Sequence, residues 1–524
     1  MVSMLMIWPI IDQVNVLLSN VVLLAALLSM LQAAAAKDQE LAFKQTLIDK
    51  LTHENALLKR MKFAAQSERF NPEQKSLLED EIEADLAAVA TEIDALQEAQ
   101  APAKVEEKKV PKRAPLPANL PRREIRHEPE STTCHTPGCG CQMKRIGEDV
   151  AEKLDYVPGV FSVHRHVRGK WACACCQNLV QAPVEPHVID KGIPTPGLLA
   201  QVLVNKFADH LPLYRQEAIF GRAGVAIPRS TLAQWVGSCG VELQPLVDAL
   251  KREILSRGVV HADETPVQML KPGQGKTHRA YLWAYAAGAH EDIKAVVYDF
   301  CASRAGSNAK AFLDEWRGSL VVDDFSGYKQ LMGDASAQIT EVGCWAHARR
   351  KFHDLQLANQ SQIAEQAVRQ IAQIYAVERE VKGLSAEERG RIRQDKSQPL
   401  VQTLYEWLVL NRQKVPEGSA TAKAIDYSLR RWSALTRFLE DGQVPVDNNW
   451  IENQIRPIAI GRNNWLFAGS LRGGQRAAAA MSLIQSAKLN GHDPHAYLKD
   501  VLTRLSTHMN SRIEELLPHR WTPV

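Results

Sequence analysis

Apolar and polar residues alternate along the middle of the chain in the manner of half-buried β-strands. The alternation recurs in blocks of seven to ten residues, a length typical of strands. Read in order, the pattern predicts strands over 258–265, 278–287 and 294–300, a helix over 307–316, a fourth strand within 318–328, and a fifth strand with a basic helix within 337–352. This part of the chain is therefore predicted to form one α/β unit.

Acidic residues stand at the ends of two of these predicted strands. Asp263 ends the first strand (GVVHADET), and Asp323 and Asp324 end the fourth (GSLVVDDFSGY). The order of the elements is that of a ribonuclease-H-like core, in which the first and fourth strands are neighbours, so we expect these acids to lie together. Because side chains alternate between the faces of a sheet, only one acid of each pair, Asp263 or Glu264 and Asp323 or Asp324, faces such a site.

A third acid, Glu452, stands in the stretch VDNNWIENQIRPIAIGRNNWLFAGS. Asp447 is predicted to cap a helix that contains Glu452 in its first turns, with Arg456 four residues later on the same face. Laid across the sheet, this helix would bring Glu452 to Asp263 and Asp323. Three carboxylates suit two magnesium ions, because hard cations prefer oxygen ligands. Paired metal ions serve phosphodiester displacement, and the surrounding arginines and asparagines would then contact phosphate.

The chain between the fourth strand and Glu452 is far longer than one sheet needs. Residues 363–381 have an amphipathic pattern, SAEE at 385–388 is typical of a capping box, and 428–442 reads as a basic helix. We therefore expect an all-helical insertion. Its candidate DNA contacts, with a solvated helix face as the alternative, are Arg430, Arg431, Trp432 and Arg437.

Apolar residues near the N-terminus repeat with a helical period. Leu41, Ile48 and Asn55 are seven residues apart, and Leu51 and Leu58 are interleaved with them. One interpretation is a short coiled coil between chains, with Asn55 setting the register. The other is a single amphipathic helix that packs on its own domain.

The neighbouring segments have distinct compositions. An acidic helix is predicted over 72–98, and a proline-rich basic linker over 101–130, where proline favours extended chain. Residues 16–36 carry no charge and are long enough to cross a bilayer. No basic residue precedes them, however, whereas a secretory signal has a positive start. The alternatives are a membrane span or signal, a self-associating helix, and a segment upstream of the natural start codon.

Cysteines are concentrated in one short part of the chain. Six of the nine lie between 134 and 176, in the stretches CHTPGCGCQ and KWACACCQ. Four thiolates from two turns suit a tetrahedral, structural zinc ion, and such a site indicates a reducing, cytoplasmic compartment. Cys141 and Cys175 leave the ligand set open, and unrelated buried thiols are the alternative. The predicted zinc ligands are Cys134, Cys139, Cys173 and Cys176.

Contacts to nucleic acid must come from local patches, because the net charge of only +3 excludes a histone-like protein. The predicted hairpin strand between the cysteine pairs contains Arg165, Arg168 and Lys170, which would meet phosphates. Residues 211–238 have the pattern of a helix, a glycine-containing turn and a second helix. This pattern fits a DNA-binding helix-turn-helix or an ordinary structural hairpin.

These predictions together describe a multidomain α+β protein. The predicted parts are a helical arm with its apolar start (1–100), the linker (101–130), a zinc-binding module (131–185), a helical, helix-turn-helix-like region (186–256), a ribonuclease-H-like core in two parts (257–354 and 442–495), the helical insertion (355–441) and a C-terminal tail (496–524).

Several long motifs resemble those of bacterial transposases of the insertion sequence 66 family, which have a DDE-type catalytic core. HADETP is similar to the family's first aspartate motif, VDDFSGY to its second, and DNNWIENQIRPIAIGRNNWLFAGS to its glutamate motif. GEDVAEKLDYVPGVFSVHRHVRGKWACACC resembles the zinc-binding segment, and GCWAHARRKF the sequence after the second aspartate. The resemblance extends from about residue 40 to the C-terminus.

The resemblance selects one acid from each adjacent pair. It implies that Asp263 rather than Glu264, and Asp323 rather than Asp324, join Glu452 as the catalytic and magnesium-binding residues. Two Mg²⁺ (or Mn²⁺) ions per active site and a structural Zn²⁺ are the implied cofactors. In two places the family pattern is basic where this chain has asparagine, Asn453 and Asn463, which lowers the positive charge near the site.

The resemblance also implies a function and partners. Such a protein binds the terminal inverted repeats of its element, cuts at the 3′ ends and joins them to target DNA. It acts as a homodimer or higher oligomer, with small accessory proteins of the same element. The alternatives are a ribonuclease-H-like nuclease without strand transfer and a DNA-binding repressor with an inactive core. His347, spaced x2 from Cys344, is an expected active-site support. The candidate DNA contacts are Arg165, Arg168, Lys170, Arg349, Arg350, Arg456, Arg462, Asn448 and Asn449.

Overall fold

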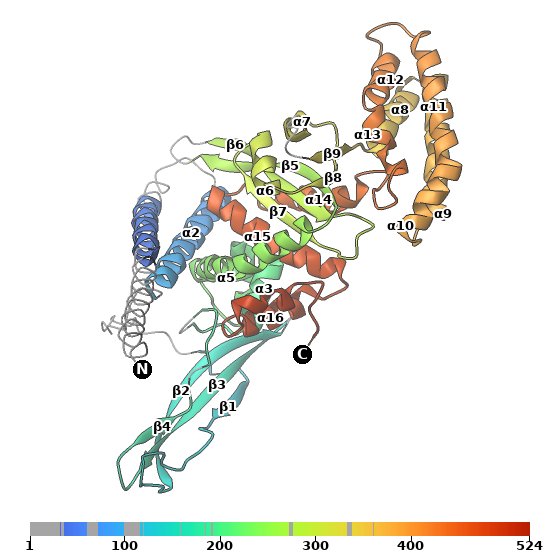
Figure 1. Ribbon diagram of the computed structural model, residues 1–524. Helices are drawn as coiled ribbons and strands as arrows, with labels where there is room; N and C mark the ends of the chain where they lie inside the picture. The colour runs from blue at the N-terminus through green and yellow to red at the C-terminus, as the bar shows by residue number, and fades with distance from the viewer. Residues whose placement is uncertain are drawn as a thin grey trace, which may run out of the picture.

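A five-stranded mixed sheet lies at the centre of the computed structural model (Figure 1). Its strands, in the order β7-β6-β5-β8-β9, are β7 (Val296–Cys301), β6 (Lys276–Ala287), β5 (Val259–Lys271), β8 (Gly318–Val321) and β9 (Ile339–Val342). β8 runs parallel to β5, so the first and fourth strands of this unit are neighbours, as the sequence predicts. The structure describes residues 32, 36–59, 72–98, 116–118, 120–157, 159–183, 185–189, 192–271, 276–332, 338–359 and 361–523.

One face of this sheet is covered by helices from the C-terminal part of the chain. α14 (Asn449–Gly461) contacts β5 and β6, and α15 (Leu471–Leu489) contacts β7. The hydroxyl of Tyr298 on β7 donates a 2.7 Å hydrogen bond to the carbonyl oxygen of Gln454 on α14. Residues of β5 that point to this face therefore meet α14.

Two short helices, α6 (Gly306–Leu313) and α7 (Ser326–Met332), cover the opposite face. The ring of Tyr285 on β6 stacks on Phe312 of α6, with ring centroids 3.7 Å apart. Adjacent residues in a strand point to opposite faces of the sheet. A residue of β5 that points toward α14 is therefore followed by one that points toward α6 and α7.

A second mixed sheet forms a long arm that projects from the core (Figure 1). β2 (Met143–Val157) and β3 (Val160–Cys173) make an antiparallel hairpin, and β4 (Leu179–Gln181) pairs with β3. β1 (Arg122–His127) pairs parallel to β3. This corrects the predicted linker over 101–130, whose last part is a strand because its polar residues fit an edge position of this arm.

The N-terminal helices pack on each other within one chain. A helix over 36–59 lies against α2 (Pro72–Glu98), and Leu51, Leu58 and Val89 are buried where they meet. This packing is the second of the two interpretations of the seven-residue repeat. A coiled coil between chains stays a prediction.

The predicted helix-turn-helix is a structural hairpin. Its helices are α4 (Leu213–Arg222) and α5 (Arg229–Leu255). α5 contacts α2, α15, β6 and β7, so closely that a Cβ on Gly237 would lie 2.2 Å from the carbonyl oxygen of Ala84. A recognition helix needs an open face to enter a major groove, and packing on both sides removes that face from α5.

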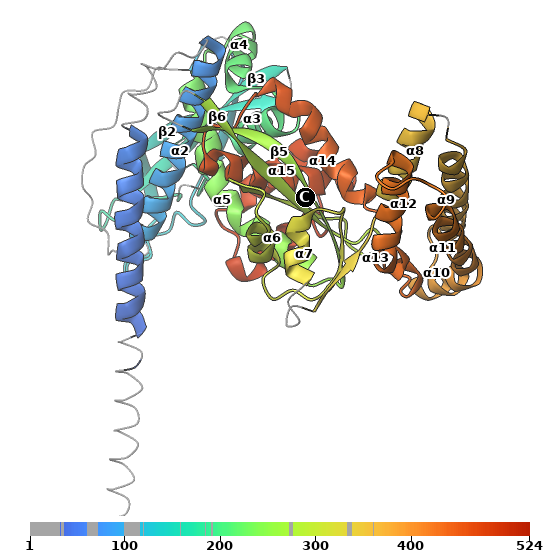
Figure 2. The same cartoon turned by 90° about the horizontal axis from the view of Figure 1, so that it is seen from above.

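Helices fill the chain between β9 and α14, and Figure 2 shows them on the side of the sheet opposite the N-terminal helix. The predicted capping box of Ser385 and Glu388 is confirmed, with both of its hydrogen bonds present. These helices have their own apolar core. They are α8 (Trp345–Asn359), α9 (Gln362–Glu380), α10 (Ala386–Ile392), η2 (Arg393–Ser397), α11 (Gln398–Arg412), α12 (Ala420–Arg430), α13 (Trp432–Thr436) and η3 (Arg437–Leu439).

α3 (Pro196–Phe207) joins the arm to the core, because it packs on β2 and on α16 (Pro494–Arg504). Two short helices remain: η4 (Arg462–Asn464) follows α14, and η5 (Asn510–Leu516) lies near the C-terminus. No helix within the described ranges is both long and apolar enough to cross a membrane. The apolar stretch 16–36 lies almost wholly outside them.

Candidate active site

Strand alternation sends the two acids of β5 to opposite faces of the sheet. Asp263 is in register with Ala284 of β6, and Glu264 with Trp283. The Tyr328 hydroxyl of α7 donates a 2.8 Å hydrogen bond to Glu264, so Glu264 lies on the α6 and α7 face. Asp263 therefore lies on the face that α14 covers.

The pairing of β5 with β8 brings the second acidic position to the first. His261 is in register with Val321, the last residue of β8. The pairing itself ends at Val321. Continued by two residues along each strand, the same register would bring Asp323 beside Asp263, and the charge of Asp323 does act on Asp263. The backbone N–H of Phe325 donates a 2.9 Å hydrogen bond to Oδ1 of Asp323, so the turn after β8 holds this carboxylate.

Glu452 lies in the first turn of α14, between this helix and α8. Its Oε1 is 3.5 Å from Nδ1 of His347, and its Oε2 is 3.5 Å from a guanidinium nitrogen of Arg350. The side chain of Glu452 is 18% exposed. Two basic side chains of α8 thus flank the carboxylate, while solvent still reaches it.

Asp263 lies in a buried place close to other acids. Burial raises the pKa of Asp263 well above its usual range, and the charges of Glu264, Asp323 and Glu452 raise it further. A buried carboxyl near three other acids lacks a compensating positive charge. A bound cation would supply that charge.

Asn448 joins α14, β5 and α8, and sequence reasoning missed this role. Its Nδ2 donates to the carbonyl oxygen of Ala262 at 2.9 Å, and its backbone N–H donates to Sγ of Cys344 at 3.2 Å. Its Oδ1 lies 2.7 Å from Nδ1 of His261. Burial lowers the pKa of His261 to about 4, so the ring is neutral and its single N–H must be on Nδ1.

Asn448 was expected to contact DNA, and the structure corrects this. Only 1% of the residue is exposed, and its side-chain oxygen and nitrogen are both bonded within the protein. It is also the N-cap of α14, the position predicted for Asp447. Asp447 instead accepts hydrogen bonds from the Tyr375 hydroxyl at 2.7 Å and from the backbone N–H of Asn449 at 3.0 Å.

Replacing Asn448 by alanine is expected to lower the free energy of unfolding by about 2–3 kcal/mol, because it leaves His261 and a buried carbonyl without partners. Urea unfolding of the purified protein measures the change. The neighbouring exposed residue supplies the control, since Asn449→Ala should cost less than about 1 kcal/mol. Equal losses in the two variants would mean that the buried hydrogen bonds contribute nothing.

The other acid of each pair is bound to an arginine. Glu264, whose side chain is 1% exposed, forms an ion pair with Arg304. Asp324 lies 2.5 Å from Arg431, which is itself buried and also pairs with Glu341 at 2.7 Å. Arg431 was a candidate DNA contact, and its burial between these acids corrects that expectation.

Glu264→Gln is expected to lower stability by about 1–3 kcal/mol, because it weakens a charge-assisted hydrogen bond in a buried place. Thermal unfolding measures it, with the exposed Glu315→Gln as control. A variant of unchanged stability that no longer processed DNA would instead assign Glu264 to the chemistry.

A metal-ion site needs ligand atoms that converge. In the described part of the chain, possible ligand atoms of Cys344, His347 and Glu452 all lie within 4.8 Å of one another. The carboxylates of Asp263, Asp323 and Glu452 do not all lie that close together in these residues. A site for two metal ions does not require them to, because its carboxylates are divided between two ions about 3.5–4 Å apart. The three acids are oxygen donors of the kind that a hard divalent cation takes.

The cysteines at the tip of the arm also converge. Sγ atoms of the four predicted zinc ligands, from the turns before β2 and after β3, all lie within 4.8 Å of one another. A tetrahedral zinc with Zn–S bonds of about 2.3 Å separates its sulfurs by roughly 3.8 Å. The donor set therefore fits zinc. These residues are Cys134, Cys139, Cys173 and Cys176.

The basic strand of the arm is not a free positive patch. Arg165 lies 3.4 Å from Glu124, and Arg168 and Lys170 lie 3.7 and 2.6 Å from Asp149. Two carboxylates of the neighbouring strands thus lie beside these three cations, and the phosphate contact expected of the three stays a prediction.

The candidate cations around Glu452 differ in accessibility. Arg349 and Arg350 on α8 and Arg456 on α14 are exposed. Arg462 donates a 2.9 Å hydrogen bond to Oγ1 of Thr265 and a second bond to the next carbonyl of β5. Arg349 and Arg456 are therefore available to a phosphate, whereas Arg350 lies beside the Glu452 carboxylate.

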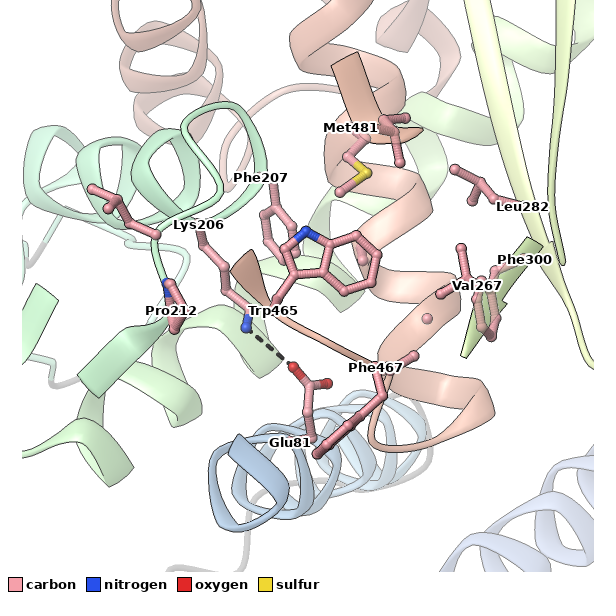
Figure 3. Close-up of a pocket in the computed structure, with 16 residues that line it drawn as sticks. Glu81, Lys206, Phe207, Pro212, Val267, Leu282, Phe300, Trp465, Phe467 and Met481 are labelled. Carbon is pink, nitrogen blue, oxygen red and sulfur yellow. Dashed lines mark hydrogen bonds and ion pairs between the residues drawn. The ribbon is translucent and has the colours of Figure 1, made fainter. Parts of the chain in front are cut away.

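A cavity of about 50 Å³ lies on the same face of the sheet, away from the acids. Figure 3 shows Val267 and Phe300 of the sheet facing Trp465, with Lys206 and Glu81 paired at 3.1 Å. Its lining is otherwise apolar, so it offers little to a nucleic-acid substrate. The acid-bearing edge of β5 and β8 is the stronger candidate.

Comparison with known proteins places most of this chain in one family. The model described as "Transposase IS66 family" matches residues 191–476, and "IS66 C-terminal element" matches 482–519. "Zinc-finger binding domain of transposase IS66" matches 132–177, and "Transposase C of IS166 homeodomain" matches 50–125. All of these describe parts of transposases.

Two relatives are similar to this chain over most of their length. The uncharacterized protein y4qI of Sinorhizobium fredii is 38% identical over 519 residues, which cover 94% of this chain and 93% of the relative. The uncharacterized protein y4jD of the same organism is 40% identical over 418 residues, 78% of this chain and 81% of the relative. The chain belongs to the IS66 transposase family.

Proposed function

We propose that this transposase is a DDE-type enzyme with a ribonuclease-H-like core, whose catalytic residues are Asp263, Asp323 and Glu452. It binds the terminal inverted repeats of its element, cuts at the 3′ ends and transfers them to target DNA. It works as a homodimer or higher oligomer, with small accessory proteins of the same element.

The register of β5 with β8 is the observation that carries this proposal. It supports a side-by-side position for Asp263 and Asp323. Burial is the main cause of the raised pKa of Asp263, and the charges of Glu264, Asp323 and Glu452 add to it. Magnesium or manganese ions held by these three acids would activate the attacking water or 3′-hydroxyl and stabilise the leaving oxygen.

Other residues of the chain orient the site and hold DNA. Asn448 and His261 fasten the start of α14 to β5, which positions Glu452. His347 and Arg350 flank the Glu452 carboxylate from α8. The exposed arginines of α8 and α14 contact DNA phosphates, which positions the strand without reading its sequence.

The zinc module at the tip of the arm is structural. Zinc would fix the turns before β2 and after β3, at a distance from the sheet that carries the acids (Figure 1). The arm then serves DNA-end binding, while the acids serve the chemistry.

A reconstituted reaction tests the proposed function. The DNA that flanks the gene should contain terminal inverted repeats, and a labelled fragment with these ends is incubated with the protein, target plasmid and Mg²⁺. Cutting followed by joining to the plasmid supports the proposal, and a fragment with scrambled ends is the control. Cutting without joining would indicate that the protein is a nuclease. Binding of the ends without cutting would indicate that it is a repressor.

A further inference from the structure

The cysteine cluster contains more ligands than one zinc ion uses. In the described residues there are two sets of four cysteine sulfurs that all lie within 4.8 Å of one another, and the sets share Cys139 and Cys173. The first set adds Cys134 and Cys176 to this shared pair. The second set adds Cys141 and Cys175, which the single zinc site leaves unused.

The six sulfurs are arranged as three close pairs. The shared pair, Cys139 and Cys173, has a sulfur–sulfur distance of 3.6 Å. Sγ of Cys134 lies 3.1 Å from Sγ of Cys176. The third pair, at 2.6 Å, is Cys141 and Cys175. One shared pair with a further pair in each tetrad is the connectivity of two tetrahedra that share an edge. On binding zinc the two shorter pairs would move apart to roughly 3.8 Å.

The backbone supports this arrangement from both sides. Gly138 and Gly140 have φ values of +83° and +58°, a conformation that glycine adopts without strain. They let the chain turn so that Cys134 and Cys141 meet, where the Cys134 N–H donates to the Cys141 carbonyl at 2.8 Å. On the facing turn, the Cys173 N–H donates to the carbonyl of Asn178 at 2.9 Å.

We propose that the six cysteines bind two zinc ions, with the thiolates of Cys139 and Cys173 bridging them. Each ion then has four thiolate ligands, the number that zinc takes in closed structural sites. No redox partner is needed, because each thiol loses one proton to solvent when it binds metal. The inference extends the zinc site proposed above and rests on it.

Two ions also explain the crowding of sulfur. With one ion, Cys141 and Cys175 would be free thiols in contact with a thiolate site of net charge −2. Six thiolates and two Zn²⁺ ions have the same net charge of −2, so the second ion adds no charge while it uses both remaining sulfurs. Soft thiolate ligands favour zinc over hard cations at such a place.

Metal analysis of the full-length protein, purified anaerobically under reducing conditions, tests the proposal. Wild type should contain about two zinc ions per chain and the double variant Cys141→Ser, Cys175→Ser about one. The control Cys301→Ser, far from the cluster, should keep two. One zinc ion in both wild type and the double variant would overturn the second site but keep the single one. No zinc in wild type would overturn both.

Thiol counting adds a readout that does not depend on metal recovery. In the native, reduced protein all six cluster thiols should resist alkylation, and a zinc chelator should release them together. Rapid alkylation of Cys141 and Cys175 in the zinc-loaded protein would overturn the proposal. A Cys141–Cys175 disulfide, detected by mass spectrometry of protein handled without oxygen, would also overturn it.

Discussion

Cutting and joining of DNA are expected to fall by about 10³-fold or more when Asp263 or Asp323 is replaced by asparagine or Glu452 by glutamine. Each amide keeps the shape of the side chain but removes a charge that a metal ion requires. The three losses should be similar and should not multiply in double variants, because the acids act as one unit. Strand-transfer assays on the element ends measure them, and anisotropy of labelled ends should show near-normal binding.

The controls for these variants follow from the structure. Glu264 and Asp324 have structural ion pairs, so their amides mix effects on folding with effects on chemistry. Asp314→Asn is a cleaner match, because Asp314 is exposed. Exposed Glu440→Gln is the match for Glu452. Normal joining by Glu452→Gln would rule out the DDE assignment.

Cys173→Ser is expected to remove bound zinc and to abolish binding of the element ends. Cys173 is 1% exposed at the end of β3 and is paired with Met143 across the hairpin. A water molecule therefore cannot take the place of its thiolate as a zinc ligand. Structural zinc contributes on the order of 10 kcal/mol to the order of such small modules. Zinc content and end-binding affinity are the measurements.

The central sheet should survive this change, because the cysteines form an apolar cluster separate from the main core. Circular dichroism and unfolding of the core provide that check. Cys301→Ser is again the control. Tight end binding by zinc-free Cys173→Ser would show that the arm does not need its metal.

The neighbouring position of the first and fourth strands could be predicted from the sequence. Alternation predicts that Asp263 and Glu264 point to opposite faces of the sheet, but the choice of Asp263 rested on the resemblance to the family. The neighbouring position of β5 and β8 requires only the order of elements along the chain.

Other features could not be predicted because they depend on partners distant in sequence. Asn448 resembles any asparagine of a polar motif, and its burial follows from contacts with His261 and Cys344, more than 100 residues away. α5 has a helix-turn-helix pattern, yet α2 covers it. One hint was available for His261, since it stands two residues before Asp263 and so points to the same face.

The helical insertion between β9 and α14 also has a consequence for synthesis of the protein. Glu452 is translated 129 residues after Asp323, a delay on the order of 10 seconds at usual elongation rates. Until α14 leaves the ribosome, the nascent chain has Asp263 and Asp323 but lacks Glu452 and Asn448. If the proposed assignment is correct, the catalytic site is therefore assembled only when synthesis of the chain is almost complete.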